Sequence, residues 1–417
     1  MKILYATRLF SGLESSFISG VWDPTGVPTI YKVIEELDRN YETRFIFSAK
    51  DSGDGYLSRW NNKKDFMTTI SGLNQSIYIL SGINFFPTWV ARKIAVALRD
   101  IRQALIIIIS TIKFKPDIIY CDHANIIVAA FLARYQKHTP VVFRAMGIYP
   151  FMRKSLTSKN IIHRIYRWSY RSPFSLVICT QDGSGVELWL DQALCTGVES
   201  KVLLNGINDT NFPNIPLDVR LNLLPENKII ILFVGKLERY KGCYEFVESI
   251  ILLIKMEFDK VHALVVGTGS EKYSLNKLVV GSHCKTNFTF IDRLPHEQII
   301  VAHQRSDIYV SMNHLGNLSN ANLEAIQSND CMVIPEPQID TGIDVITSQL
   351  LDGVVVKVPI NSPDKLSEVL SELIGSVDKR DTMSRAINIR KKKFLWSWKE
   401  RIKIETELLE STIKNKN

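Results

Sequence analysis

The sequence lacks the features that mark a secreted, zinc-binding or membrane-spanning protein. Its six cysteines are scattered, and no two of them form a C-x-x-C pair. This spacing argues against a disulfide framework or a zinc site and predicts reduced cysteines in a cytosolic protein. The longest apolar run, residues 104–112, is far shorter than the about 20 residues that span a bilayer. The N-terminal MKILYATRLF is too short an apolar run for a signal peptide and predicts a first strand.

Acidic residues are absent between Asp122 and Asp182. The same interval contains many bases, namely Arg134, Lys137, Arg144, Arg153, Lys154, Lys159, Arg164, Arg167 and Arg171. Aromatic residues and isoleucines alternate with these bases, as in a helix that lies on anionic lipid. The alternative is a solvated helix whose aromatic residues lie in the core. The formal net charge of +8 favours an anionic partner in either case.

Nucleic acid is not the partner that we expect. The sequence shows no helix-turn-helix, zinc or RNA-binding signature to accompany its basic charge. Phosphorylated substrates or acidic lipid headgroups remain as the anionic partners.

The chain is organised around residues 229–242, IIILFVGKLERYKG. Residues 229–234 form the kind of apolar, β-branched run that a strand buried on both faces of a parallel sheet shows. Gly235 ends this run, and a helical pattern begins at Cys243. The loop between them carries Lys236 and Lys241 at the carboxyl edge of a parallel sheet, where open α/β sheets bind ligands. Phosphate is the ligand that such a cationic loop suits best. The alternative is an ordinary solvated loop.

Strand, glycine-containing loop and helix recur along the chain. Residues 2–7 predict a strand, and Gly26 lies in the polar loop that we expect before the next helix. Residues 263–266 predict another strand, which leads into Gly267 and Gly269. Because strands alternate with helical patterns throughout, the sequence predicts an α/β protein with doubly wound sheets.

The second half of the chain resembles the family 4 retaining glycosyltransferases of the GT-B fold. The motifs occur in the order of that family: F-V-G-K-L-E-R-Y-K-G at residues 233–242, F-I-D-R-L-P-H-E at residues 290–297, and N-A-N-L-E-A at residues 320–325. The resemblance covers most of residues 176–405 and is looser before residue 176.

The resemblance implies the domain organisation. Two Rossmann-like doubly wound domains would face a cleft, with a C-terminal helix crossing back to the first domain. The expected boundaries are 1–207 for the acceptor-binding domain, 208–393 for the nucleotide-sugar-binding domain and 394–417 for the helix.

The resemblance also implies the reaction and its residues. Such enzymes transfer a sugar from a nucleotide diphosphate sugar, here a UDP- or GDP-sugar, without a metal or other cofactor. Lys236 and Lys241 would neutralise the diphosphate, and Glu324 would accept hydrogen bonds from the ribose. Arg293 and Leu294 occupy the positions that hold the base. The remaining nucleotide contacts implied by the family are Gly26, Gly235, Gly267, Gly269, Asn320 and Leu323.

The sequence departs from the family at two positions. Gly316 stands where the first glutamate of a pair should lie, and Met146 stands where a histidine near the donor sugar is usual. We expect neighbouring amides such as Asn317 or Asn320 to fill the gap at Gly316. His123 is a candidate catalytic replacement for the missing histidine; alternatively, it is a hydrogen-bonded structural residue.

These features predict a cytoplasmic glycosyltransferase at the inner face of the cell membrane. Its acceptor would be a lipid-linked or other saccharide in the synthesis of cell-surface polysaccharide, such as O-antigen, capsule or exopolysaccharide. The alternatives are a non-catalytic partner subunit of the same fold, which the two departures would suit, and a nucleotide-sugar epimerase.

Overall fold

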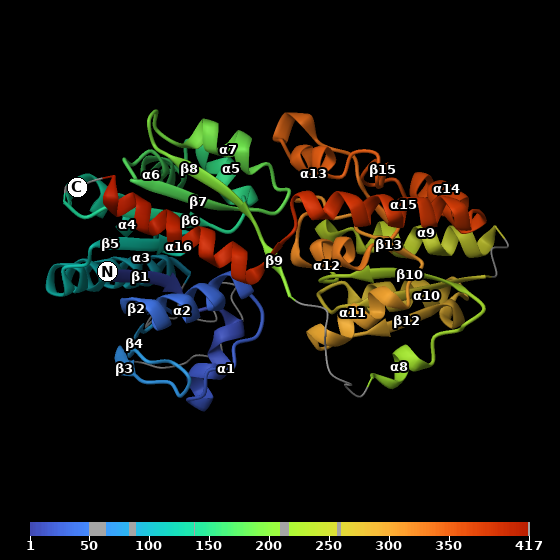
Figure 1. The fold of residues 1–417 in the computed structure, drawn as a ribbon, viewed down its shortest axis with the longest axis horizontal. Coiled ribbons are helices and arrows are strands. Elements are labelled where there is room, and N and C mark those ends of the chain that lie inside the picture. Colours follow the sequence, from blue (N-terminus) through green and yellow to red (C-terminus); the bar gives the residue numbers. More distant parts are fainter. Residues whose placement is uncertain (50–63, 83–88, 137, 209–216, 257–259, 416–417) are drawn as a thin grey trace. The chain divides into compact units, whose positions relative to one another are not determined.

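The computed structural model describes residues 1–49, 64–82, 89–136, 138–208, 217–256 and 260–415 (Figure 1). The chain divides into two compact units. Unit 1 comprises residues 1–180, 189–203 and 399–417, and unit 2 comprises residues 181–188 and 204–398.

Unit 1 is built on a sheet whose strand order, among the described residues, is β3-β4-β2-β1-β5-β6-β7-β8. β3 is antiparallel to β4, and pairing from β4 through β7 is parallel. The strands are β1 (Lys2–Arg8), β2 (Glu42–Ser48), β3 (Phe66–Thr68), β4 (Ile77–Leu80), β5 (Ile118–Asp122), β6 (Val141–Ala145), β7 (Leu176–Gln181) and β8 (Ser200–Leu204).

The helices of unit 1 connect these strands. They are α1 (Ser11–Ser19), α2 (Pro28–Asn40), α3 (Trp89–Phe114), η2 (His123–Asn125), α4 (Ile126–Tyr135), α5 (Pro150–Thr157) and α6 (Ile161–Tyr170). α7 (Val186–Ala193) spans the boundary of the two units, and α16 (Trp398–Lys414) returns the chain to unit 1. The sequence predicted a loop where α1 lies. Gly12 can enter this helix because its missing side chain leaves room for the Thr25 carbonyl, 1.5 Å from where a Cβ would stand.

Unit 2 contains a parallel sheet with the strand order β12-β11-β10-β13-β14-β15. Its strands are β10 (Ile229–Val234), β11 (Val261–Val266), β12 (Phe288–Ile291), β13 (Ile308–Val310), β14 (Met332–Pro335) and β15 (Val356–Val358). Two further short strands, β9 (Gly206–Ile207) and β16 (Trp396–Ser397), pair with each other.

Helices accompany the strands of unit 2 as in other doubly wound sheets. They are α8 (Val219–Asn222), η3 (Arg239–Lys241), α9 (Cys243–Lys255), α10 (Lys272–Gly281), η4 (Lys285–Asn287), α11 (His296–Gln304), α12 (Asn320–Ser328), η5 (Ile339–Thr341), α13 (Val345–Leu350), α14 (Pro363–Gly375), α15 (Val377–Arg390) and η6 (Lys391–Lys393).

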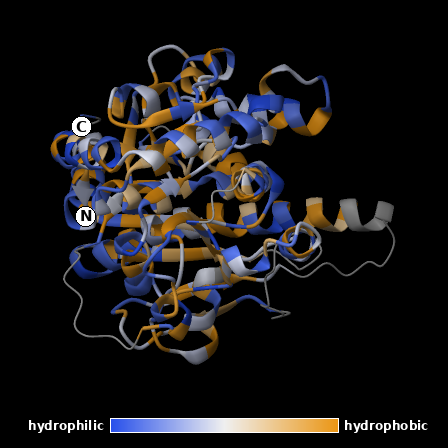
Figure 2. Cartoon of the chain, turned by 90° about the vertical axis from the view of Figure 1, so that its right-hand side faces the viewer, coloured by the Kyte–Doolittle hydropathy of each residue, from blue (hydrophilic) through white to orange (hydrophobic). Residues whose placement is uncertain are grey.

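β10 lies at the centre of unit 2 and is covered on both faces. Ile231 and Phe233 belong to one hydrophobic cluster, whereas Ile230 and Leu232 belong to another. Successive side chains of a strand point to opposite faces, so a continuous apolar run serves both clusters. The strands are accordingly coloured largely as hydrophobic in Figure 2.

The strand order reverses between β10 and β13. β11 and β12 follow β10 on one side, and β13 to β15 follow on the other. Ligands of open α/β sheets bind at the carboxyl ends of the strands that flank such a reversal. The loops that follow β10 and β13 therefore define where a ligand is expected.

Among the described residues, none of the helices combines the length and the apolar content needed to cross a bilayer.

Candidate functional site

The loop between β10 and α9 places two lysines at the strand reversal. Lys236 is exposed and Lys241 is partly buried. Burial lowers the pKa of Lys241; the charge of Asp182 raises it, and the charge of Lys236 lowers it further. The two ammonium groups are thus close enough to repel each other. A bound anion would relieve this repulsion.

The two glycines of the G-x-G motif allow two loops to stack against each other. A Cβ on Gly267 would stand 1.8 Å from the carbonyl oxygen of Gly235, and one on Gly269 would stand 2.3 Å from that of Leu237. The Leu237 amide also donates to the carbonyl of Thr268 at 3.0 Å. These glycines therefore shape the edge of the site through packing, while nucleotide binding by them stays a prediction.

The loop after β13 lies against the β10–α9 loop. A Cβ on Gly242, which has a φ of +75°, would stand 2.3 Å from Met312. The His314 backbone amide donates to the Tyr240 carbonyl at 2.9 Å. The Nε2 atom of the His314 ring lies 2.5 Å from Glu245 Oε1. The loops on the two sides of the strand reversal therefore form one connected surface.

Glu324 lies in the second turn of α12, partly buried. Its Oε1 is 3.3 Å from His296 Nδ1. Burial raises the pKa of Glu324 to about 7, although the charge of His303 acts to lower it. The carboxyl group therefore changes its charge near neutral pH.

We expect nucleotide affinity to depend on the ionisation of Glu324. The ionised carboxylate accepts hydrogen bonds from ribose hydroxyls, and it predominates above pH 7. Affinity should therefore fall about tenfold between about pH 8 and about pH 6. Glu324→Gln should bind the nucleotide about tenfold to a hundredfold less tightly at the higher pH.

Calorimetric titrations of both proteins across pH check this expectation. Their difference isolates Glu324, because the nucleotide's own phosphate titration is common to both. Equal affinities for the wild type and Glu324→Gln at every pH would show that Glu324 does not contact the nucleotide.

Gly316 occupies a position that has no room for a side chain. Its φ is +126°, and an added Cβ would lie 2.5 Å from the carbonyl carbon of Gly183 and 2.6 Å from the Asp182 oxygen. The Leu318 amide donates to that same oxygen at 3.0 Å. The departure from the paired glutamates thus has a steric cause: residues 182–184 fill the space beside Gly316.

Two carboxyl groups lie at this contact, those of the partly buried Asp182 and the buried Asp344. Burial raises the pKa of Asp182 to about 6 and that of Asp344 to about 6; the charge of Lys241 acts against the shift at Asp182. The charge of Asp182 contributes to the raised pKa of Asp344. The sequence marked Asp182 only as the end of an interval without acidic residues and gave no signal for Asp344.

Asn317 is not available to replace the missing carboxylate. It is fully buried, and its Nδ2 donates to Asp344 Oδ2 at 2.6 Å and to the Asn313 carbonyl at 2.8 Å. Its Oδ1 accepts from Ser311 Oγ at 2.7 Å. The expectation that Asn317 contacts a ligand is therefore wrong, because its polar atoms serve the loop itself.

Substitution of Gly316 should cost stability. A Cβ at this φ collides with backbone that cannot move away as a side chain would, so Gly316→Ala should lower the free energy of unfolding by about 2–4 kcal/mol. Gly281→Ala is the matched control, since Gly281 ends α10 with nothing within 4 Å of an added Cβ. That control should remain within about 1 kcal/mol of the wild type. Urea unfolding measures both, and a Gly316→Ala protein as stable as the control would disprove the steric account.

The other predicted nucleotide contacts divide into surface and core. Arg293 is exposed just beyond β12, and Asn320 Oδ1 accepts from Asn205 Nδ2 at 2.7 Å. The Leu294 and Leu323 side chains belong to a hydrophobic cluster of unit 2. Both leucine side chains thus pack in the core, and nucleotide contacts at these two positions stay a prediction.

In unit 1, Gly26 lies where the sequence placed it, two residues before α2. Its φ is +67°, and nothing lies within 4 Å of an added Cβ. Its conformation thus favours glycine while its surroundings are open, and anion binding by Gly26 stays a prediction.

His123 begins η2 at the carboxyl end of β5. Its Nε2 is 2.9 Å from the hydroxyl of Tyr170, whose ring stacks on the imidazole. Burial lowers the pKa of His123 to about 4, aided by the charge of Arg8. A neutral ring that shares a hydrogen bond with Tyr170 favours the structural alternative, and a catalytic role stays a prediction.

Comparison with known proteins shows which proteins residues 216–390 resemble. Residues 216–390 match the model of a family described as glycosyl transferases group 1. An uncharacterized glycosyltransferase of Methanocaldococcus jannaschii is 26% identical over 235 residues, which cover 53% of this chain and 58% of that protein. The chain therefore spans less than two thirds of that relative. These matches confirm the predicted resemblance at the level of glycosyltransferases, and membership of family 4 stays a prediction.

Solved structures share the fold along the whole chain. Sucrose-phosphate synthase from Thermosynechococcus elongatus has a TM-score of 0.71 at 13% identity, covering 99% of both chains. Anabaena HepE in complex with UDP has a TM-score of 0.66 at 14% identity, covering 99% of this chain and 100% of that one. At such identities the likeness establishes the fold, and it confirms the predicted GT-B fold with two Rossmann-like domains.

Proposed function

We propose that the protein is a glycosyltransferase that moves a sugar from a nucleotide diphosphate sugar to a saccharide acceptor. The observation that carries this proposal is the pair Lys236 and Lys241, which a parallel sheet holds at its strand reversal. The match of residues 216–390 to glycosyl transferases group 1 supports it. Solved structures of the same fold with UDP or UDP-glucose support a uridine nucleotide as the donor carrier.

The proposed chemistry needs positive charge where the leaving group forms. As the bond between the sugar and the diphosphate breaks, negative charge grows on the diphosphate. The diphosphate of the bound donor is already anionic, so Lys236 and Lys241 favour the bond-breaking state over the ground state through the further negative charge that develops as the bond breaks. Retention of configuration and independence of a metal are parts of the proposal.

We further propose that the acceptor is lipid-linked and that the protein works at the inner face of the cell membrane, in cell-surface polysaccharide synthesis. The support is the basic segment that contains α5 and α6. Lys154, Lys159 and Arg164 are exposed on it, together with Ile161 and Ile165. Each exposed base near an anionic surface adds about 1 kcal/mol of attraction.

A second function has one observation in its favour. Gly316 leaves no space for the glutamate that holds the donor sugar in the family. A non-catalytic subunit of the same fold would bind the nucleotide without transferring a sugar; an epimerase would release no sugar to an acceptor.

A thermal-shift screen of nucleoside diphosphates and their sugars tests the proposal. We expect one nucleoside diphosphate and one of its sugars to raise the melting temperature. Release of the free nucleoside diphosphate from that sugar, in the presence of membrane extract as acceptor, then separates an enzyme from a non-catalytic subunit. Stabilisation by no nucleotide, together with stabilisation by oligonucleotides, would contradict the proposal.

A further inference from the structure

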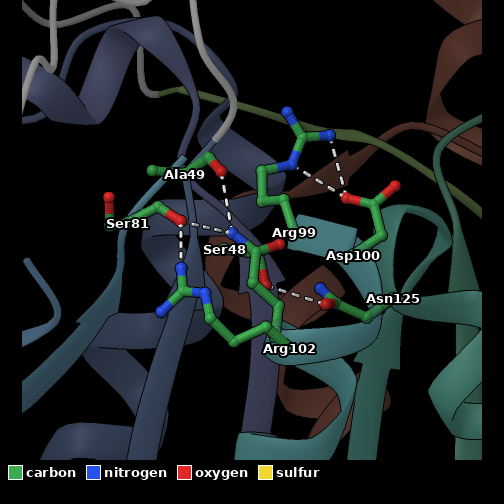
Figure 3. Close-up of polar contacts among 8 residues, drawn as sticks. Ser48, Ala49, Ser81, Arg99, Asp100, Arg102 and Asn125 are labelled. Carbon is green, nitrogen blue, oxygen red and sulfur yellow. Dashed lines mark hydrogen bonds and ion pairs between the residues drawn. The ribbon is translucent and has the colours of Figure 1, made fainter. Parts of the chain in front are cut away.

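The side of α3 that faces its own unit combines polar side chains with the buried Ala95 and Ile107. Arg99, Gln103, Ser110 and Thr111 are all buried. Gln103 Nε2 donates to the carbonyls of Ala49 and Ser81, both at 3.0 Å. Figure 3 shows these carbonyls; Arg102 Nη2 also donates to that of Ser81, at 2.6 Å, whereas Arg99 pairs with Asp100. Hydrogen bonds to the ends of two strands therefore hold part of the inner side of this helix.

The opposite side of α3 is apolar and exposed. Six large side chains, each 48–65% exposed, recur there at helical spacing and form what we call the α3 stripe: Ile94, Leu98, Ile101, Leu105, Ile109 and Ile112. At 1.5 Å per residue the stripe is about 27 Å long. A helix on the surface of a soluble domain normally turns such a stripe inward.

Neighbouring helices extend the exposed apolar surface. α3 connects β4 to β5, α4 connects β5 to β6, and α6 leads from β6 to β7. All three connections run in the same direction across the sheet. Because such connections are right-handed, the three helices lie on the same face of the sheet. α3 contacts α4, and α4 contacts α6. These two helices add exposed apolar residues: Ile127, Phe131, Tyr135, Ile161, Ile162, Ile165 and Trp168. Together with the α3 stripe they form the apolar face of unit 1, and contiguous patches of this kind mark interaction sites.

The charges of these helices select the partner. α3 carries Asp100 as its one acidic residue, and α4, α5 and α6 carry none. Lys113, Lys154, Lys159 and Arg164 are exposed on or beside the same helices. A second copy of the chain would bring like charges together across a symmetric contact. An anionic lipid surface offers acyl chains to the apolar residues and headgroup charge to the bases.

We propose that the apolar face is a membrane-binding surface and that the α3 stripe inserts shallowly into anionic lipid. This inference extends the membrane association proposed above, but it rests on apolar insertion by α3 and does not require transferase activity. Charge alone would give binding that high salt abolishes. Insertion by α3 predicts that part of the binding survives high salt.

Vesicle co-sedimentation of the full chain tests the inference. The probes are phosphatidylcholine vesicles with and without phosphatidylglycerol, at low and high salt. The triple variant Leu98→Gln, Ile101→Gln, Leu105→Gln should lose at least about tenfold in partitioning and should lose the salt-resistant fraction. The control triple Val280→Gln, Ile339→Gln, Ile389→Gln removes apolar residues of unit 2 that are at least as exposed, and it should bind as the wild type does.

Two further measurements decide the remaining outcomes. Unchanged urea unfolding and nucleotide binding by the α3 triple variant would show that its loss is specific to lipid. Vesicle binding by that variant equal to the wild type, or no vesicle binding by the wild type, would overturn the inference. A wild-type dimer that the α3 substitutions dissociate in sedimentation velocity would also overturn it, by assigning the face to a second copy. The transferase proposal is judged separately, by nucleotide release with a soluble acceptor.

Discussion

Replacing Lys241 with alanine is expected to lower turnover about 10²–10³-fold, which corresponds to a loss of roughly 3–4 kcal/mol of transition-state stabilisation. Lys241 lies beside Lys236 at the strand reversal, partly shielded from solvent. A charge in such surroundings acts on a developing anion more strongly than one in water. Because the loss arises as the bond breaks, kcat should fall more than the affinity for the nucleotide sugar.

Two control variants test whether the effect at Lys241 depends on its charge and on its position. Lys241→Arg restores the charge and should recover part of the turnover. Lys277→Ala removes an exposed lysine from α10 and should leave turnover within about twofold. The urea midpoint of Lys241→Ala should stay close to that of the wild type. Normal turnover by Lys241→Ala would remove this lysine from the mechanism.

The second large effect is expected at Glu405, in the buried part of α16. Arg144 Nε lies 3.2 Å from Glu405 Oε1, and Arg401 Nη1 lies 2.5 Å from Oε2. All three side chains are essentially inaccessible to solvent, and the hydroxyl of Tyr120 also donates to Glu405. One carboxylate thus serves as the counter-charge for two buried guanidinium groups.

Glu405→Gln should lower the free energy of unfolding by about 3–5 kcal/mol, because it removes the carboxylate that pairs with both buried arginines and leaves Arg144 only its weaker interaction with the charge of Asp122. Glu407→Gln is the matched control on the same helix, where the exposed Glu407 lies 3.8 Å from Lys403. That change should cost less than about 0.5 kcal/mol. Urea unfolding followed by circular dichroism measures both, and equal midpoints for the two variants would refute the account of the buried cluster.

The same cluster predicts how stability depends on pH. Burial acts to raise the pKa of Glu405, but Arg144 and Arg401 outweigh it, so the pKa lies below its ordinary value. A carboxyl group whose pKa is lower in the folded state contributes stability above its unfolded pKa of about 4.3. This contribution is lost as the pH falls through the folded pKa, and it should be missing from the acid unfolding of Glu405→Gln.

The central strands could be predicted because their signal is local. Residues 229–234 form β10 as predicted, since a strand covered on both faces must be apolar at every position. The loop lysines and Glu324 could be named as candidate site residues because the motifs that contain them are also local in the sequence. The sequence missed α1 because Gly12 is required by a contact with Thr25, and that contact exists only in the folded chain.

The remaining features of the site depend on contacts between distant parts of the sequence. Gly316 looked like a lost carboxylate, whereas residues 182–184 fill the space beside it. Leu294 and Leu323 matched family positions, but burial assigns their side chains to the core. The hydrogen-bonded inner side of α3 became evident only in the structure, because its partners lie at the ends of two strands that are distant in the sequence.

A crystal structure of the protein with the nucleoside diphosphate that stabilises it most tests the central claim directly. The account predicts that the diphosphate lies within hydrogen-bonding distance of Lys241 Nζ and that a ribose hydroxyl donates to Glu324. A nucleotide bound anywhere other than the carboxyl ends of β10 and β13 would contradict it.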